Sequence, residues 1–342
     1  MDLFDHYEGK AVHSLTLENE FLQLKLIDFG ARIVSCVLKK NGADVVQGFD
    51  SLSCYLNGVR YMGTTVGRLC NRLGKGQFKL NGVQYQTPIN NGPNTLHGGP
   101  NGFDYQIFEV LEHSESHVVY RYFSKHLEEG FPGNLELKIT YRLLEDGFTF
   151  ESEAVSDEDT LCSITNHAFF NMNGCDSETA MNHTVTVFAD QVGCSDADGL
   201  TLEKAFDVEG TPFDFRKGAV VGEMLKHEAE NQQMINGHGI DHCFVLNGKG
   251  LKSAAVVEGD KALMEVKTTM PCMHFYSGNF LKGDTAGKNG TAYQYRSAMC
   301  FEPEHYPNAI QYHNWEKPLL KKGEVQKHLT EYHFRMKQSV VE

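Results

Sequence analysis

The polar residues that could carry chemistry occur in clusters, and the first cluster combines an amide, a guanidinium and an imidazole. Asn71 and Arg72 end the segment Gly-Arg-Leu-Cys-Asn-Arg, and His97 lies in Asn-Thr-Leu-His-Gly-Gly further along. A guanidinium offers several fixed donors to hydroxyl groups, and the glycines after His97 would let a ligand come close to the backbone. Alone, the pattern is more typical of a turn with a solvated arginine and a histidine bonded to its own loop.

A second histidine, His167, lies in the apolar and aromatic run Thr-Asn-His-Ala-Phe-Phe-Asn (165–171). Buried polar side chains need hydrogen-bond partners, so a satisfied core histidine is one interpretation. The other is functional, because a desolvated imidazole that titrates near neutrality can pass a proton in either direction.

The third cluster centres on the carboxylates Glu302 and Glu304, which would share one face of a strand that continued through Pro303. Proline instead favours a sheet edge or a bulge. The apolar residues 298–301 lead into Glu302, and an apolar setting raises the pKa of a carboxylate into the range of a general base. We interpret Glu304 and His305 as rim residues.

A fourth, weaker cluster contains Asp241 in His-Gly-Ile-Asp-His (238–242), which is either a loop with solvated charges or a ligand-binding turn. The sequence contains no phosphate-cradling loop, no dinucleotide fingerprint and no Gly-x-Ser-x-Gly elbow, so we predict no nucleotide cofactor and no serine hydrolysis. The nine cysteines are scattered without a Cys-x-x-Cys pair, which predicts reduced core thiols and no zinc site.

The elements that must position these clusters are mostly strands. Apolar and polar residues alternate over 22–26, 118–122 and 135–143, which is the period of a strand buried on one face. Asp146-Gly147 predicts a hairpin after the last of these runs, and Asn81-Gly82 predicts another. The best helical signal is a surface helix over about 221–232. With no linker or repeat, we expect residues 1–342 to form a single, mainly antiparallel all-β domain, a large sandwich.

Charge narrows the choice of partner. The 31 Lys and Arg against 45 Asp and Glu give a formal net charge of −14, which opposes binding to nucleic acid or to an anionic membrane. The amino terminus lacks the layout of a signal peptide, and no stretch is apolar enough to span a membrane. We therefore expect a soluble, cytoplasmic protein with a small, neutral partner.

Taken in order, the clusters resemble the aldose 1-epimerase family, also called galactose mutarotases. The resemblance extends from about residue 29 to residue 336, nearly the full chain. Its motifs are GRLCNR (67–72), NTLHGG (94–99), TNHAFFN (165–171), GIDHCFVL (239–246), FYSGNFL (275–281) and FEPEHYPN (301–308).

The resemblance implies a β-sandwich of the galactose mutarotase type with few short helices, and an open cleft in which the α and β anomers of D-galactose or D-glucose interconvert. In this scheme His167 protonates the ring oxygen, Glu302 takes the proton from the C1 hydroxyl, and His97 orients the reacting atoms. No cofactor or metal is implied, and the state expected is a monomer or a homodimer.

The resemblance also implies which residues bind the sugar. Asn71, Arg72 and Asp241 match positions that bind sugar hydroxyls. His274 and Glu304 depart from the pattern, because family members often carry glutamine at both places. We expect His274 to contact the substrate and both departures to affect which aldose is preferred.

Two rival functions remain open at this stage. One is a sugar-binding sandwich without catalytic activity, against which the acid and base pair argues. The other is a metal-dependent, cupin-like sugar isomerase, since imidazoles and carboxylates are ordinary ligands for zinc, iron or manganese. The ligands in that case would be His238, His242, Glu302, Glu304 and His305.

Overall fold

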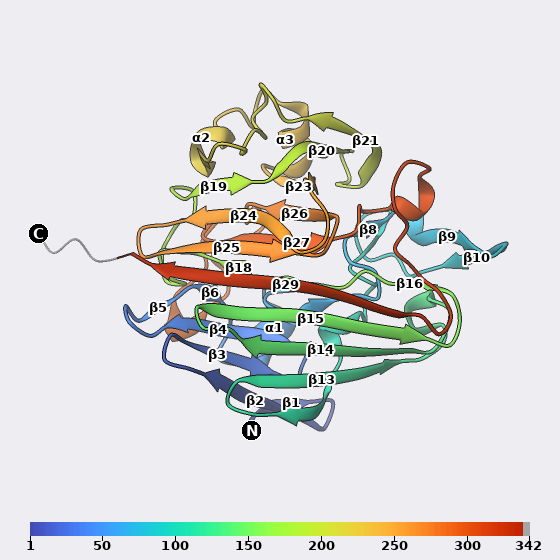
Figure 1. Cartoon of the computed structure of the whole chain (residues 1–342), viewed down its shortest axis with the longest axis horizontal. Coiled ribbons are helices and arrows are strands. Elements are labelled where there is room, and N and C mark those ends of the chain that lie inside the picture. The colour runs from blue at the N-terminus through green and yellow to red at the C-terminus, as the bar shows by residue number, and fades with distance from the viewer. Residues whose placement is uncertain (338–342) are drawn as a thin grey trace, which may run out of the picture.

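A computed structural model describes residues 1–337, and antiparallel sheets dominate it (Figure 1). The largest sheet has nine strands. In spatial order they are β12 (Glu109–His113), β13 (His117–Ser124), β14 (Leu135–Leu143), β15 (Gly147–Ser156), β29 (Val325–Met336), β25 (Ala262–Thr268), β24 (Lys252–Glu258), β19 (Thr184–Val187) and β22 (Ala219–Val220).

A seven-stranded sheet carries most of the candidate site. Its order is β21 (Thr201–Asp207), β20 (Ala189–Ser195), β23 (Asp241–Leu246), β26 (Cys272–Tyr276), β27 (Met299–Glu304), β18 (Phe169–Phe170) and β6 (Val46–Gln47). A third sheet runs in chain order through β1 (Asp2–Tyr7), β2 (Lys10–Glu18), β3 (Leu22–Ile27), β4 (Arg32–Leu38) and β5 (Ala43–Asp44).

Short pairs and helices complete the fold. The pairs are β7 (Thr65–Val66) with β17 (Thr165–Asn166), β8 (Arg72–Leu73) with β11 (Thr95–Leu96), β9 (Gln77–Leu80) with β10 (Val83–Gln86), and β16 (Thr160–Leu161) with β28 (Leu319–Leu320). The helices are α1 (Leu52–Asn57), α2 (Val221–Leu225) and α3 (Gln232–Gly237).

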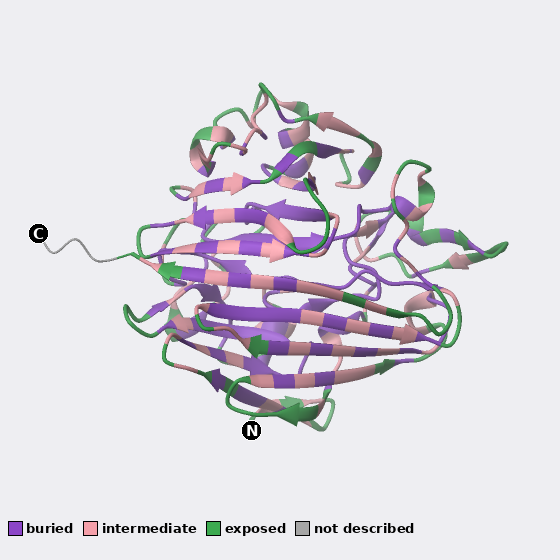
Figure 2. Ribbon diagram, in the orientation of Figure 1, coloured by how far each residue is buried: buried purple, intermediate pink, exposed green. Residues whose placement is uncertain are grey.

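The two larger sheets pack face to face over an apolar core. Phe170 of β18 lies 5.3 Å, centroid to centroid, from Tyr332 of β29. Along β14 the alternate residues Leu135, Leu137 and Ile139 are fully buried, so the period-two pattern corresponds to one inward face (Figure 2). The predicted class, an all-β antiparallel sandwich with few short helices, is confirmed.

The hairpins form at the predicted turns. β14 and β15 pair through Leu143 and Phe148. β9 and β10 join at Asn81-Gly82, where both residues have positive φ, as a two-residue turn of this kind requires.

The helix prediction is wrong in extent, because α2 ends at Leu225 and the next helix begins at Gln232. The break has a local cause: the Asn231 side chain accepts hydrogen bonds from the backbone N–H groups of Gln233 and Met234 and so caps a new helix.

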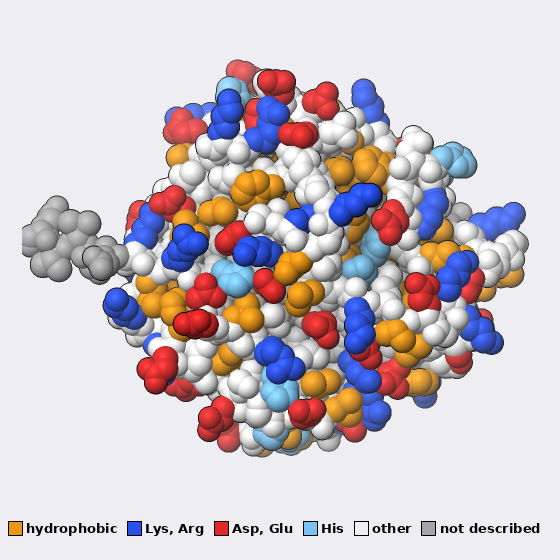
Figure 3. Space-filling model, viewed as in Figure 1, with side chains coloured by type: hydrophobic (Ala, Val, Ile, Leu, Met, Phe, Trp, Pro, Cys, Tyr) orange, Lys and Arg blue, Asp and Glu red, His pale blue; other side chains and the backbone are white. Residues whose placement is uncertain are grey.

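All nine cysteines are free thiols, as predicted, and seven of them are buried. Within residues 1–337 no helix is long and apolar enough to cross a membrane. Basic and acidic side chains are interspersed on the face that Figure 3 shows.

Candidate active site

β27 places two carboxylates on one buried face. Glu302 and Glu304 are 1% and 0% exposed, and β26 pairs with β27 along its length, with His274 opposite Glu302. β18 pairs only with Met299 and Cys300. The strand therefore passes through Pro303 and is hydrogen bonded there to β26 only, which is the one-sided pairing that proline allows.

The interpretation of Glu304 and His305 as rim residues is wrong. Glu304 is fully buried, and His305 is 5% exposed with its Nδ1 3.2 Å from Ser163 Oγ. The strand that ends at Glu304 is buried on both faces, whereas the proline suggested a sheet edge or a bulge. Burial raises the pKa of Glu304 to about 7.

His167 faces Glu302 across the candidate site. Its Nε2 lies 3.6 Å from Glu302 Oε1. Two backbone hydrogen bonds fix the residue: its N–H donates to the carbonyl of Thr64, and its carbonyl accepts from Gly63, both at 2.8 Å. The ring stacks on Phe169, with centroids 5.2 Å apart.

Burial drives the proton affinities of this facing pair in opposite directions. It lowers the pKa of His167 to about 4 and raises the pKa of Glu302 well above its usual value, where Glu304 and Asp241 add to the rise. Both shifts favour the neutral forms, so in the sugar-free pocket the single proton of the pair lies on Glu302 and His167 is neutral. An arrangement of this kind suits general acid–base catalysis.

His97 completes the trio from β11 and its following turn. The backbone N–H of Asn71 donates to His97 Nδ1 at 3.0 Å, and His97 donates its own N–H to the carbonyl of Asn71 at 3.1 Å. Since Nδ1 accepts, the proton of the neutral ring lies on Nε2. Burial holds the pKa of His97 well below its usual value, and His167 and Arg72 lower it further.

A second set of polar groups lines the same pocket. Arg72 lies in β8, which pairs with β11, and its NH2 group is 3.8 Å from Asp241 Oδ2. His274 Nε2 lies 2.7 Å from Asp241 Oδ1. Burial would raise the pKa of Asp241, but the hydrogen bond from His274 and the charge of Arg72 outweigh it and bring the pKa to about 2.

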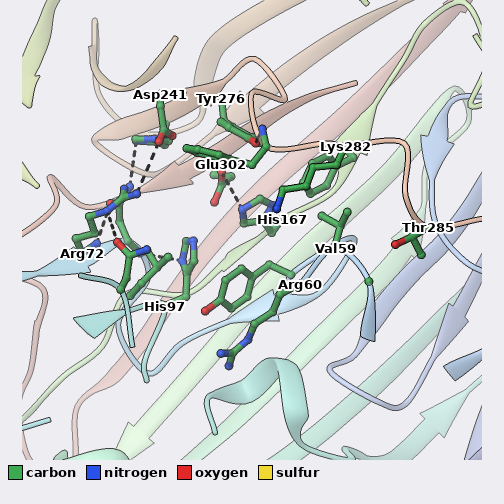
Figure 4. A pocket seen from close by; sticks show the side chains of 18 of the residues that line it. Val59, Arg60, Arg72, His97, His167, Asp241, Tyr276, Lys282, Thr285 and Glu302 are labelled. Carbon is green, nitrogen blue, oxygen red and sulfur yellow. Dashed lines mark hydrogen bonds and ion pairs between the residues drawn. The ribbon is translucent and has the colours of Figure 1, made fainter. Parts of the chain in front are cut away.

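All seven predicted site residues line one pocket of about 490 Å³ (Figure 4). They are Asn71, Arg72, His97, His167, Asp241, His274 and Glu302. The volume falls in the range typical of sites for small molecules. Because the residues come from six separate segments, their convergence is a property of the fold and not of any one motif.

The sequence did not lead us to predict the aromatic side chains that line the pocket. Tyr61 lies with its ring 4.7 Å from that of His97 and 5.9 Å from that of His167, and Tyr276, Phe169 and Phe280 also line the pocket. Three of these four residues fall inside the motifs quoted above, so their nearness in sequence to the predicted site residues could have indicated that they line the pocket. Tyr61 lies outside every motif, and nothing in its sequence context distinguishes it.

The glycines after His97 have a different role from the expected one. Gly98 and Gly99 do not line the pocket. A Cβ on Gly98 would overlap the carbonyl oxygen of Gly67, and one on Gly99 would overlap the Glu129 carboxylate. The two glycines therefore allow protein segments to approach each other closely.

The ligands of the rival metal site are not brought together. His242 Nε2 lies 3.1 Å from Ser195 Oγ, His305 contacts Ser163, and His238 follows α3 as its C-cap. Within residues 1–337 the one group spaced for a metal is His97, His167 and Glu302, whose potential ligand atoms lie within 4.8 Å of one another.

That trio is a poor fit to a metal because of the His97 tautomer. Nδ1 of His97 is occupied by the Asn71 N–H and Nε2 carries the ring proton, so the neutral imidazole has no free lone pair to donate. Metal-binding histidines instead donate a lone pair from one nitrogen while the other carries the proton. The donor set is better suited to handling protons.

Comparisons with known proteins identify the family. The sequence profile described as Aldose 1-epimerase matches residues 13–333. The chain is 36% identical over 329 residues to galactose mutarotase of Bos taurus, covering 94% of each chain. It is 31% identical over 338 residues to aldose 1-epimerase of Escherichia coli, covering 96% of each.

Solved structures show the same fold. A GalM/aldose epimerase homologue from C. elegans superposes with a TM-score of 0.88 at 27% identity, covering 96% of this chain and 100% of that one. Galactose 1-epimerase from Lactobacillus acidophilus superposes with a TM-score of 0.86 at 27% identity, covering 98% of each.

These similarities define the chain as an isomerase of the epimerase class. It belongs to the aldose 1-epimerase family, and its relatives support aldose 1-epimerase activity.

Proposed function

We propose that this protein interconverts the α and β anomers of free hexoses, D-galactose and D-glucose among them, by acid–base ring opening. The observation that carries the proposal is the facing pair of His167 Nε2 and Glu302 Oε1, 3.6 Å apart in the pocket. The names of the relatives, galactose mutarotase and aldose 1-epimerase, point to the same reaction.

The reaction needs one proton given and one taken at neighbouring atoms. The ring oxygen and the C1 hydroxyl are bonded to the same carbon, so an acid and a base only a few ångströms apart can serve both. Once the proton of the pair has passed from Glu302 to His167, His167 protonates the ring oxygen while Glu302 removes the C1 hydroxyl proton, and the ring opens to the aldehyde. After rotation about the C1–C2 bond, the reverse transfers close the ring on the other face.

The remaining polar groups orient the sugar. The Nε2–H of His97 points a donor at the reacting oxygens, which stabilises the charge that develops there. Arg72 and Asp241 offer a donor and an acceptor to ring hydroxyls, and His274, with Asp241 as its partner, borders the same wall. The aromatic rings of Phe169 and Tyr276 give the sugar an apolar surface.

The sequence charge fits this choice of substrate, because a neutral sugar is not repelled by a chain of net charge −14. The same charge disfavours nucleic acid and anionic membranes. The cytoplasmic location and the monomeric or homodimeric state expected from the sequence stay predictions.

Polarimetry tests the proposal. Freshly dissolved α-D-galactose relaxes slowly in water, and we expect catalytic amounts of protein to speed the relaxation without added metal and after dialysis against a chelator. If relaxation is no faster than in buffer, a sugar-binding protein without catalytic activity is the better interpretation. Activity that a chelator removes and a divalent metal restores would favour the metal-dependent isomerase.

A sugar panel defines the specificity. Rates on D-galactose, D-glucose, D-xylose, L-arabinose and D-fucose, measured under the same conditions, would rank the hydroxyl groups that the pocket recognises. We expect activity on both D-galactose and D-glucose.

A further inference from the structure

Asn91 lines the pocket from the segment between β10 and β11, and it lies outside the motifs quoted above. Its backbone is fixed in a tight turn, because its N–H donates to the carbonyl of Asn94 at 3.1 Å and its carbonyl accepts from the Asn94 N–H at 2.9 Å. The Asn90 side chain ties this turn to β11, since it accepts from the Leu96 N–H at 2.7 Å and donates to the Leu96 carbonyl at 3.0 Å. The half-buried side chain of Asn91 therefore extends from a rigid backbone.

A contact with Arg72 fixes which way the amide of Asn91 points. Arg72 Nε lies 3.0 Å from Asn91 Oδ1. Because a guanidinium N–H can only donate, the amide oxygen must face Arg72 and the amide nitrogen, Nδ2, must face away from it. Among residues 1–337 Nδ2 has no hydrogen-bond partner, and the atom is accessible to solvent. Both of its hydrogens are therefore free to donate.

The guanidinium that orients Asn91 is itself held in place. Its NH2 group lies 3.8 Å from Asp241 Oδ2, and the Arg72 side chain is only 11% exposed. A Cβ on Gly199 would lie 2.9 Å from Arg72 Cζ, so the turn between β20 and β21 packs directly against the guanidinium. With Arg72 held in this way, the free amide nitrogen of Asn91 is a preorganised donor that loses little conformational entropy when a ligand binds.

We propose that Asn91 determines substrate specificity: its Oδ1 holds Arg72, and its Nδ2 donates a hydrogen bond to a sugar hydroxyl that takes no part in ring opening. The inference rests on the proposed function, since it adds a substrate contact to that reaction.

A fixed donor of this kind distinguishes a hydroxyl from a hydrogen at one carbon of the sugar. The hydroxyl oxygen accepts from Nδ2 without displacing any protein group, whereas a sugar that lacks this hydroxyl leaves the donor without its partner. Sites built to hydrogen bond a substrate hydroxyl discriminate against analogues without it for this reason.

Asn91→Asp separates the two roles of the side chain. Aspartate keeps the size of the side chain and an oxygen acceptor for Arg72 Nε, but it has no N–H to donate. We expect kcat/KM on D-galactose to fall about 3- to 10-fold, the usual effect of losing one hydrogen bond. The added charge could also change the rate on every sugar equally, so the decisive comparison is among sugars.

That comparison uses the ratio of wild-type to Asn91→Asp kcat/KM. The sugars are D-galactose and its derivatives with hydrogen or with fluorine in place of the hydroxyl at C2, C3, C4 or C6. Fluorine accepts hydrogen bonds but cannot donate to a carboxylate, so at the contacted carbon the ratio should be the largest of the series. With hydrogen at the same carbon neither protein makes the contact, and the ratio should be the smallest.

Equal ratios on all of these sugars would overturn the inference, because the variant would then act through its charge or through Arg72 alone. Gln84→Glu is the matched control. It adds the same charge on the exposed face of β10, outside the pocket, and should behave as wild type on every sugar.

Nitrogen-15 NMR supplies a readout that does not depend on turnover. The side-chain amide signals of Asn91 are identified as the pair missing from Asn91→Asp. They should shift when D-galactose is added, and shift less with the deoxy sugar that gives the smallest ratio. Asn91 amide signals that stay in place at saturating D-galactose would overturn the inference.

The two proposals fail differently. Wild-type protein that does not speed anomer relaxation overturns the proposed function, while the NMR titration still decides whether Asn91 contacts the sugar. Wild-type protein that is active but gives equal ratios overturns the role of Asn91 alone.

Discussion

At the scale of single residues, the site is a set of proton positions that the surrounding hydrogen bonds dictate. His97 accepts at Nδ1, so its Nε2–H is a donor. His167 and Glu302 lie 3.6 Å apart with shifted pKa values of opposite sign. Burial makes both charged forms costly, so in the sugar-free pocket the pair holds its one proton on Glu302.

Removing either member of the facing pair should abolish most of the activity. We expect His167→Asn and Glu302→Gln each to lower kcat by about 10²- to 10⁴-fold, because one proton transfer loses its partner. Glu302→Gln keeps the size of the side chain and His167→Asn replaces the ring with a smaller polar group, so circular dichroism should report an intact fold. Wild-type turnover in either variant would require the roles to be reassigned.

Glu304 should set the alkaline limit of activity through its charge. With a pKa of about 7, it is ionised above neutral pH, and its negative charge is one cause of the raised pKa of Glu302. Glu304→Gln keeps a carbonyl acceptor for Asn71 but removes that charge, so Glu302 loses its proton at lower pH. That proton is the one that the His167–Glu302 pair must deliver to the ring oxygen, and the pair is inactive without it. The alkaline limb of the kcat/KM profile should therefore move to lower pH.

A limb that stays in place, or that moves to higher pH, would contradict this coupling between the two carboxyl groups. Glu136→Gln is a suitable control, because Glu136 lies on β14, away from the pocket, and its replacement should leave the profile unchanged.

The site residues could be predicted from the sequence because each lies in a polar motif within an apolar run. The burial of Glu304 could not be predicted from the sequence, because Pro303 indicated a sheet edge or a bulge. Only the pairing with β26 shows that the strand continues through Pro303 to Glu304. The contact of Tyr61 with both histidines depends on a turn that hydrogen bonds to His167, and no local pattern encodes it.

At the scale of elements, very short ladders position the chemistry. β8 and β11 are two residues each, yet their pairing sets Arg72 beside Leu96 and so brings His97 to the pocket. The turn that follows is closely packed, because Gly98 lies against the carbonyl of Gly67. Gly98 therefore affects both the stability of the fold and the position of His97.

Gly98→Ala and Gly82→Ala form a matched pair. Both glycines have positive φ, at 87° and 84°, but a Cβ on Gly82 would meet nothing within 4 Å. Gly82→Ala should cost about 1–2 kcal/mol from backbone conformation alone. Gly98→Ala should destabilise more and also lower kcat, because the clash moves the turn that holds His97. Equal urea midpoints for the two variants would contradict this explanation.

Local elements were predictable where the turn residues and the strand period agreed, as at Asn81-Gly82 and Asp146-Gly147. The order of strands in the nine-stranded sheet could not be predicted from the sequence. β29, from the end of the described chain, lies between β15 and β25 and pairs with both. Pairing between segments so far apart depends on packing of the whole chain, which no local periodicity contains.

At the scale of the whole molecule, we propose that the chain folds as the single domain expected from the sequence. One apolar cluster contains residues from Leu15 to Phe334 and draws on all three larger sheets. Unfolding in urea, followed by tryptophan fluorescence and by circular dichroism, should give coincident transitions. Two resolved transitions would instead indicate separately folding units.

Stability should fall as the pH is lowered from 7 to 5. Burial lowers the pKa values of six histidines. Between pH 6.5 and about 4 the unfolded chain therefore binds protons that the folded chain does not bind. Each proton of imbalance is worth about 1.4 kcal/mol per pH unit. The histidines are His97, His167, His183, His242, His305 and His328.

Five groups oppose this effect, because their raised pKa values let the folded chain bind protons first as the pH falls: Glu302, Glu304, Asp28, Asp104 and His333. These five groups do not outweigh six histidines, so the urea midpoint should be lower at pH 5 than at pH 7. A midpoint that is equal or higher at pH 5 would show that the histidines are accessible to protons in the folded state.

The convergence of six chain segments on one pocket also bears on how the protein reaches its active form. Contacts between distant segments form slowly, because a long loop must close before the contact stabilises it. A chain with its hairpins formed but β23, β26 and β27 not yet docked against the β8–β11 turn would be compact, rich in strands and unable to turn over substrate. Catalysis therefore marks the final stage of folding, whereas strand content can be complete earlier.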